Sequence, residues 1–253
     1  MVARQTISFT IILLGSVFVL ASGLAAVLAG FGSRWEWWDF TTGFTILRWS
    51  AYGGLAGGLA CGLGLVGSLR TGMSGLVVLA LAGLLIGLVV SGIPWNWMRT
   101  AKRVPPIHDI TTDTDDPPQF VAILNLRKNA PNSAEYGAPD IAAQQRKAYP
   151  EVKPLLMDVP VAAAFDSARA VAARLGWEIV DANRTDGRIE AVDRTFWFGF
   201  QDDIVIRILP DGAGSRVDLR SVSRVGKSDI GTNAKRIMRF LSQLQKKQHN
   251  KPS

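Results

Sequence analysis

The chain has 253 residues, of which 48% are hydrophobic and 19% are charged, and its formal net charge is +7. Only four of the 28 basic and two of the 21 acidic residues precede Trp95, so the remainder holds 24 basic and 19 acidic residues and carries +5. Those charges are interspersed and no base-reading motif is present, which argues against nucleic-acid binding. Because Cys61 is the single cysteine, an intramolecular disulfide is excluded. The counts of one cysteine and two histidines also argue against Cys-His catalysis and multi-histidine metal sites.

Three long apolar runs occupy the first hundred residues. The runs 7–32 and 73–93 contain no charged residue, and the run 47–69 contains only Arg48, at its edge. Because a helix rises about 1.5 Å per residue and needs roughly 20 apolar residues to cross the hydrocarbon core, each run predicts a transmembrane helix. We expect Pro94 to end the third helix.

Tryptophans mark the ends of these runs. Six of the eight lie there: Trp35, Trp37, Trp38, Trp49, Trp95 and Trp97. Amphipathic indole rings favour the boundary between lipid and water, and with three spans all six fall on one side of the membrane. The first run also resembles a cleavable signal peptide, because Arg4 precedes it and Val27-Leu28-Ala29 offers a small-residue cleavage site. Its length and the two spans that follow favour a retained anchor.

Glycines recur every fourth residue in the second run, at Gly54, Gly58 and Gly62. Small residues at this spacing let helices approach closely in lipid, so we expect helix–helix association through these glycines and an antiparallel hairpin of the second and third spans. The stretch from Gly62 to Gly67 also matches the dinucleotide-binding pattern G-x-G-x-x-G. That match is spurious because no strand precedes it and another apolar span follows.

Beyond the spans, residues 99–118 read as a linker and extended polar segment, 119–247 as a soluble domain and 248–253 as a disordered tail. Asp140 to Tyr149 predicts a short helix. A longer helix is expected to begin at Asp158 and end at Gly176, and a last one to begin at Ser228 or Asp229 with Ile230 on its apolar stripe. Alternating residues between them predict four strands, near 177–181, 188–194, 203–208 and 216–223.

These elements predict an α+β fold, in which a three-helix transmembrane region is followed by a two-layer sandwich: a four-stranded antiparallel meander with two helices on one face. Because neighbouring strand residues point to opposite faces, Asp202 and Asp203 are not expected to share a site. Whether the segment before Asp158 covers the other face stays open at this point.

Several dispersed motifs resemble the domain-of-unknown-function family numbered 1499. They are Ile107-His108-Asp109-Ile110-Thr111-Thr112-Asp113, Asp116-Pro117-Pro118, Ala148-Tyr149-Pro150, Arg220 to Gly226, Ser228-Asp229 and Asn233 to Ile237. The resemblance covers Val104 to Leu244 and implies a bacterial or plastid protein, often with membrane or signal segments, and no assigned activity. Many relatives carry Pro-Asn-Cys-Val-Ser, whereas this chain has Asn129-Ala130-Pro131-Asn132-Ser133, so no thiol chemistry carries over.

His108 is the candidate for acid–base catalysis, since His249 lies in the tail. The alternative is a histidine that bonds the loop backbone. The carboxylates of Asp109, Asp113 and Asp115 are candidate ligands for a hard cation such as calcium, but the EF-hand pattern is absent, and turns in which Asp113 and its neighbours bond their own backbone are the alternative. No metal or cofactor is expected.

Basic and polar residues near the end of the domain form a candidate site for a phosphate or carboxylate, together with His108 and the aspartates before Pro117. The candidate binding residues are His108, Asp109, Asp113, Asp116, Arg220, Ser221, Ser223, Arg224, Asn233, Lys235 and Arg236. The favoured alternative is that these arginines pair with Asp218, Asp229 or the acidic segment around Asp109.

The sequence thus favours a membrane-anchored, non-enzymatic binding or scaffold domain at the bacterial inner membrane, with an envelope-related role. Two alternatives are a hydrolase or lyase that uses His108 with nearby aspartates, and a lipid or small-anion binding module. The expected partners are the lipid bilayer and an acidic or anionic envelope component. Basic residues flanking the spans favour a cytoplasmic domain, whereas the family's habit of following signal segments favours the periplasm, which we prefer.

Overall fold

A computed structural model describes residues 2–72, 74–137 and 139–249 of the chain. It divides into two compact units. The first contains the residues up to Thr100 together with Phe196–Gly199, and the second contains Ala101–Thr195 and the chain from Phe200 onward. The first unit is helical and the second combines a sheet with helices, so the predicted α+β class is confirmed.

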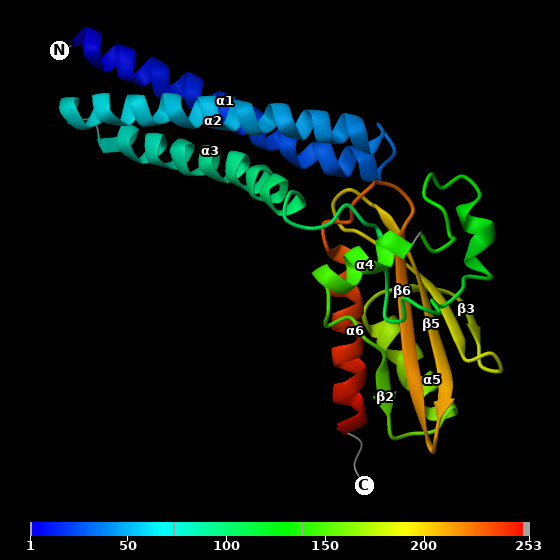
Figure 1. The fold of residues 1–253 in the computed structure, drawn as a ribbon. Helices are drawn as coiled ribbons and strands as arrows, with labels where there is room; N and C mark the ends of the chain where they lie inside the picture. Colours follow the sequence, from blue (N-terminus) through cyan, green and yellow to red (C-terminus); the bar gives the residue numbers. More distant parts are fainter. Residues whose placement is uncertain (1, 73, 138, 250–253) are drawn as a thin grey trace. The chain divides into compact units, whose positions relative to one another are not determined.

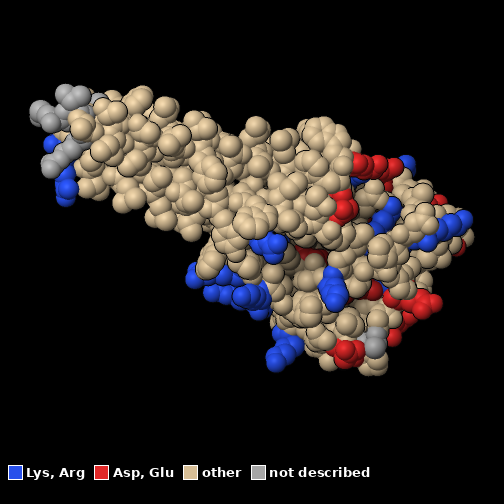
Figure 2. Space-filling view, turned by 90° about the horizontal axis from the view of Figure 1, so that it is seen from above, with Lys and Arg blue, Asp and Glu red and all other residues tan. Residues whose placement is uncertain are grey.

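The first unit contains three long helices, α1 (Val2–Arg34), α2 (Phe40–Thr71) and α3 (Ser74–Ala101). Each is long and apolar enough to cross a membrane, and the helix surfaces visible in Figure 2 are almost without charged side chains. The carboxylate of Asp39 begins α2 by accepting the backbone N–H of Thr41. The three predicted spans are therefore present as helices.

Pro94 does not end the third helix, so that prediction is wrong: α3 continues to Ala101. Proline lacks an amide hydrogen and disturbs one turn, but a helix can resume beyond it when its other backbone groups remain paired within the segment. The helix consequently carries Trp95 and Trp97 within its last two turns.

Glycines allow the helices of the first unit to approach closely. Gly58 and Gly87 face one another, since a Cβ atom added to Gly87 would lie 2.8 Å from the Cα of Gly58 and 2.6 Å from the carbonyl oxygen of Gly54. A second face of α2 approaches α1, where a Cβ on Gly57 would lie 2.9 Å from the carbonyl oxygen of Gly15. The expected approach of α2 and α3 at Gly54 and Gly58 is present, within this chain, whereas the approach to α1 was not predicted.

The second unit contains a six-stranded antiparallel sheet with the order β1-β6-β5-β4-β3, and β2 also pairs with β6 (Figure 1). Its strands are β1 (Asp109–Thr111), β2 (Leu155–Met157), β3 (Glu178–Asn183), β4 (Arg188–Arg194), β5 (Gln201–Asp211) and β6 (Gly214–Ser223). The predicted four-stranded meander is β3 to β6. The two short strands were not predicted, and β1 lies in the segment expected to be extended.

Helices α5 (Val161–Arg174) and α6 (Thr232–His249) cover one face of the sheet. Phe165, Ala168 and Ala172 of α5 belong to the same buried core as the isoleucines of β5, and Trp177 stacks on Phe240 of α6 with ring centroids 5.3 Å apart. This is the helical layer that the apolar stripes predicted. A short helix, α4 (Pro139–Ala148), matches the helix expected near Asp140.

Two predicted helix starts are wrong. Pro160, not Asp158, precedes the first turn of α5, and its carbonyl oxygen accepts the N–H groups of Ala163 and Ala164. The last helix begins at Thr232, since Ile230 has a φ of 54° and Gly231 a φ of 77°. Ile230 is therefore not on the helical stripe. The tail expected from residue 248 overlaps the end of α6, and residues 250–253 lie outside the described residues.

The other face of the sheet is covered by the segment between β1 and α4, which answers the question that the sequence left open. Phe120 and Ile123, the latter in a 3₁₀ helix (Ile123–Arg127), pack on Val192, Val205 and Val222 of the sheet. Strands β4, β5 and β6 are thus covered on both faces. Charged residues that point to this second face must consequently find partners inside the protein.

Candidate functional site

Arg220 is fully buried on the second face of the sheet, in β6. Its guanidinium donates to both carboxylate oxygens of Asp109, from Nε to Oδ1 at 2.9 Å and from Nη2 to Oδ2 at 2.7 Å, and it also donates to two backbone carbonyls. The rings of Phe120 and Tyr136 lie over it, with their centroids 5.2 and 5.4 Å from Cζ. For Arg220 the structure therefore has the alternative to anion binding, an internal arginine–aspartate pair, with Asp109 as the partner.

Burial also changes the acidity of groups around Arg220. Burial raises the pKa of Asp109, and the hydrogen bonds and positive charge of Arg220 oppose that rise. Burial, with the nearby charge of Asp109, raises the pKa of Tyr136 to about 12. The Tyr136 hydroxyl is buried without a hydrogen-bond partner among the described residues. Tyr136 therefore contributes to the fold through its ring, which packs on Arg220.

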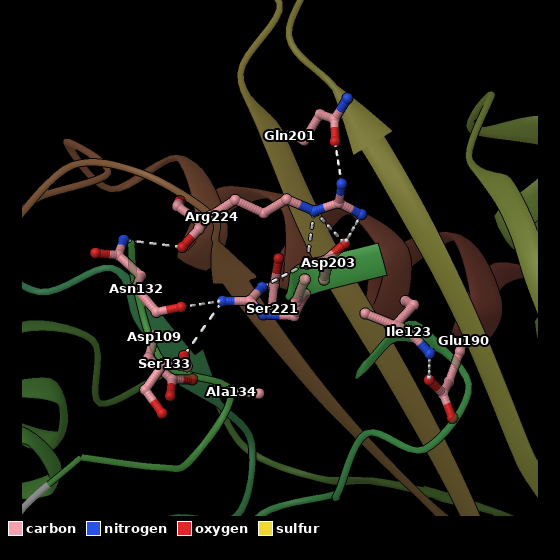
Figure 3. A network of polar contacts seen from close by, with 12 residues as sticks. Asp109, Ile123, Asn132, Ser133, Ala134, Glu190, Gln201, Asp203, Ser221 and Arg224 are labelled. Carbon is pink, nitrogen blue, oxygen red and sulfur yellow. Dashed lines mark hydrogen bonds and ion pairs between the residues drawn. The ribbon is translucent and has the colours of Figure 1, made fainter. Parts of the chain in front are cut away.

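Asp203 holds two arginines together on the same face (Figure 3). Its carboxylate pairs with Arg127 of the 3₁₀ helix and accepts from Arg224, whose Nη2 lies 2.7 Å from Oδ1. Arg127 also donates to the carbonyl oxygens of Asn132 and Ser133, at 2.9 and 3.2 Å. Arg224 is thus engaged internally, and the covering segment is fixed to the sheet at this point.

The opposite face of the same strands carries a second polar cluster, under α6. Arg236 donates to Asp202 and, at 2.7 Å, to Asp193. Ser221 donates to Asn233, and the Asn233 amide donates at 2.9 Å to the carbonyl oxygen of His108. Asp202 and Asp203 therefore serve opposite faces, as the strand alternation predicted.

The same cluster includes Ser223, whose hydroxyl oxygen accepts from the Asn233 amide at 3.0 Å. Lys235 is exposed and, with Asp193, Arg236 and Arg239, lines a hollow of about 260 Å³. The candidate residues Ser221, Ser223, Asn233 and Arg236 consequently connect α6 to the sheet, whereas Lys235 stands outside their hydrogen-bond network.

The aspartates considered for calcium are spread over several internal contacts. Asp113 accepts the backbone N–H groups of Asp115 and Asp116 at 3.1 and 3.0 Å, and its other oxygen accepts from Arg216 at 2.6 Å. Asp116 pairs with Arg207 at 2.8 Å. Among the described residues, no group of three acidic, histidine or cysteine side chains is placed to hold a metal ion. The alternative to cation binding, a turn in which the Asp113 side chain bonds the neighbouring backbone, is therefore present.

A cavity of about 480 Å³ lies beside His108 in the second unit. Most of its wall surface is apolar, and its polar residues are His108, Asp109, Asn132, Ser133, Glu135 and Lys227. The Asn132 amide donates to the carbonyl oxygens of Ser223 and Gly226, both at 2.9 Å, so one wall is tied to the end of β6. Of the predicted binding residues, only His108 and Asp109 line this cavity.

Glu190 is a buried residue that the sequence analysis missed. Its carboxylate accepts the backbone N–H groups of Val121, Ala122 and Ile123, at 2.9 to 3.1 Å (Figure 3). These amides begin the 3₁₀ helix, where N–H groups lack partners within the helix and attract an anion. The available signal was a carboxylate between Ile189 and Ala191, in the middle of the predicted strand Arg188–Arg194. Arg127, Asn132, Glu135 and Lys227 gave no comparable signal, because their neighbours are set by the tertiary structure.

A comparison with known proteins finds a family match over the part of the chain that forms this sheet and its cover. The family model described as Protein of unknown function (DUF1499) matches residues 109–244, which begins at β1 and ends within α6. A search of curated proteins finds no match. The matched range holds both ion-pair clusters and most of the cavity lining, and it is more than half of the chain. The protein is therefore a member of the DUF1499 family, carried behind three apolar helices that are able to span a membrane.

Proposed function

We propose that this protein is a membrane-anchored, non-enzymatic binding protein whose ligand enters the cavity beside His108. The observation that carries the proposal is the combination of an open, largely apolar cavity of about 480 Å³ with a neighbouring set of charges that neutralise one another. Ligand cavities in proteins typically have volumes of about 300–1,000 Å³, apolar walls and a few polar groups.

The polar groups on the lining suggest the class of ligand. Asp109 is neutralised by Arg220, so Glu135 and Lys227 are the remaining acidic and basic residues of the lining. Opposite charges beside apolar walls suit a small zwitterion with an apolar side group, such as an amino acid or a short peptide. Lys227 would attract its carboxylate and Glu135 its ammonium group.

The arrangement around His108 gives less support to a hydrolase or lyase. A catalytic histidine needs a carboxylate or backbone partner that orients its ring and a nucleophile or substrate within hydrogen-bond reach. Both carboxylate oxygens of Asp109 are bonded to Arg220, and Ser133 accepts the N–H of Glu135. These contacts favour binding over catalysis at this cavity.

Nuclear magnetic resonance of the full chain in lipid nanodiscs tests the proposal. The chain has two histidines, so protein labelled with [15N]histidine gives a signal from the cavity at His108 and an internal control at His249. We expect L-phenylalanine to shift the His108 signals in a saturable way and to leave those of His249 unchanged. Ligands that lack the ammonium group (3-phenylpropionate) or the carboxylate (phenethylamine) should bind more weakly.

Variants of the lining make the test specific. K227M should remove the preference for phenylalanine over phenethylamine, and E135Q should remove the preference over 3-phenylpropionate. I141W, which places a larger side chain at the wall, should abolish the His108 shift. If none of the three compounds shifts the His108 signals, or if they shift equally in I141W, the cavity is not the binding site and the proposal fails.

The place of action is part of the proposal: the bacterial inner membrane, with the α+β domain on the periplasmic side and a role in the envelope. Three spans place the two chain ends on opposite sides of a membrane. In cells with a permeabilised outer membrane, an impermeant thiol reagent should label a cysteine at Ser253 and should label one at Gln5 only after lysis. Cys61 is buried and serves as the unreactive background. The opposite labelling pattern would place the domain in the cytoplasm.

A further inference from the structure

Three consecutive aromatic residues, Phe196, Trp197 and Phe198, lie in the loop between β4 and β5. The loop is closed at its base by a hydrogen bond from the Thr195 N–H to the Phe200 carbonyl oxygen at 2.9 Å. Although β4 and β5 belong to the sheet, residues Phe196–Gly199 form one compact unit with the three apolar helices. The tip of this loop is therefore part of the helical unit.

Trp197 fits a position on α1 that has no side chain. Its indole N–H donates to the carbonyl oxygen of Val27 at 2.9 Å, and its ring centroid lies 5.3 Å from that of Trp97. A Cβ atom added to Gly30 would lie 2.3 Å from the indole ring, so glycine is required where the ring sits. Arg34 is the last residue of α1, and at 1.5 Å per residue Val27 lies about 10 Å from it along the helix axis.

Phe198 occupies a similar position on α2. Its ring centroid lies 4.9 Å from that of Phe44, and a Cβ on Gly43 would come within 2.9 Å of the Phe198 ring. Arg34 donates from Nη1 to the carbonyl oxygen of Phe196 at 3.0 Å, which satisfies a backbone group of the loop. The loop backbone and two of its three aromatic rings are thus accommodated by the helices.

Phe196 points away from these contacts. Phe196 is 78% exposed, and its ring makes a T-shaped contact with Phe31 at a centroid distance of 5.5 Å, next to Trp35. An exposed phenylalanine beside tryptophans near the end of an apolar helix matches the aromatic belt at a membrane–water boundary. The ring continues a surface that already faces lipid if α1 spans the membrane.

We propose that the loop Phe196–Gly199 is a fourth membrane contact: Trp197 and Phe198 pack on α1 and α2, and the Phe196 ring enters the boundary between headgroups and acyl chains. Its partner is the lipid of the bilayer in which the three helices lie. The contact does not depend on any ligand of the cavity beside His108.

Spin-label accessibility of the full chain in phosphatidylcholine–phosphatidylglycerol nanodiscs tests the lipid contact. In a C61A background, F196C carries the label, and A213C in the exposed β5–β6 turn is the control. We expect the label at position 196 to collide several-fold more with oxygen, which concentrates in lipid, than with a water-soluble nickel chelate. The label at position 213 should show the reverse. Equal access of the nickel chelate to both positions would overturn the proposal.

A pair of glycine variants tests the packing of the loop. G30A adds a methyl group where the Trp197 ring lies, whereas G92A adds one in α3 where nothing lies within 4 Å. Both changes raise helix propensity, so neither is expected to unfold its helix. We expect G30A to make the label at position 196 accessible to the nickel chelate and G92A to leave it in lipid, with position 213 unchanged in both. Retention of the lipid-like signal in G30A would show that the loop does not pack on α1 as inferred.

Discussion

Single residues with buried charge show how strongly this domain depends on internal pairing. Arg220 has no exposed surface, and its guanidinium contacts a carboxylate, two carbonyl oxygens and two aromatic rings. Such a pair contributes little more than well-packed apolar residues would, but the loss of one member leaves an uncompensated charge. The arginines of β6 are therefore best understood as parts of the interior.

R220A should destabilise the domain by about 3–5 kcal/mol, because it leaves Asp109 buried without its cation. R146A is the matched control: its pair with Asp115 is exposed, at 3.5 Å, and the change should cost less than about 1 kcal/mol. Chemical denaturation of the full chain in nanodiscs, followed by circular dichroism of the sheet, measures both. Equal losses in the two variants would contradict the structural role of Arg220.

Asp113 should make stability depend on pH. Burial alone would raise the pKa of this carboxyl, but the N–H groups of Asp116 and Asp115 and the charges of Arg216 and Arg207 outweigh burial and lower it. The Asp113 carboxyl thus binds a proton less readily in the folded state than in the unfolded state. Its contribution to the free energy of unfolding is therefore present above the ordinary pKa of 3.8, and it is lost as the pH falls through the lower pKa of the folded state.

D113N removes that titration. We expect the wild-type protein to lose stability more steeply than D113N as the pH falls below the ordinary value of 3.8, measured as the midpoint of thermal unfolding at each pH. At pH 7 the variant should be the less stable of the two, because the neutral amide loses its charge pairing with Arg216. Parallel pH profiles of the two proteins would rule out a contribution from Asp113.

At the scale of elements, the covering segment between β1 and α4 is held by a few polar contacts and a small apolar cluster. Glu190 holds the start of the 3₁₀ helix, Arg127 holds its end, and Phe120 and Ile123 supply the apolar contact. A segment with little regular structure keeps its shape here because its backbone groups bond to side chains of the sheet.

E190Q should loosen this segment. The amide nitrogen of glutamine donates rather than accepts, so at least one of the backbone N–H groups of residues 121–123 loses its partner, at a cost of about 1–3 kcal/mol. Hydrogen exchange of those amides should accelerate, while exchange within β5 should change less. E178Q, at an exposed position of β3, is the control and should leave exchange unchanged. Unchanged exchange in E190Q would mean that Glu190 does not hold the segment.

For the whole molecule, the decisive property is that the first unit presents apolar helix surfaces to its surroundings. Leu63, Val78 and Leu85 are among many large apolar side chains that are more than half exposed. Exposed apolar area on this scale is unfavourable in water and requires lipid or a partner. The helices are therefore expected to set where the protein resides, whatever the α+β domain binds.

Alkaline carbonate washing of membranes from cells that express the full chain should leave the protein in the membrane pellet. Carbonate releases proteins that are held only by charge, whereas burial of three apolar helices in lipid persists at high pH. Detergent should then release it. Recovery of the intact chain in the carbonate supernatant would contradict three membrane spans.

The sequence by itself determined the elements whose signal is local or periodic. Apolar runs of the required length identified three helices, alternation identified β3 to β6, and apolar stripes identified α5 and α6. It also placed Asp202 and Asp203 on opposite faces, because side chains alternate along any strand. The family motifs marked the part of the chain that the family model matches.

The sequence favoured pairing of the arginines with aspartates, but only the tertiary structure decided which carboxylate each arginine binds. Asp109 and Arg220 are 111 positions apart, and Asp113 and Arg216 are 103 apart, so no local rule could pair them. Short strands such as β1 gain their hydrogen bonds from β6 rather than from their own pattern, and Glu190 finds its partners in a distant loop. Contacts between distant segments depend on how the chain closes, and the periodicity of a single segment does not encode that closure.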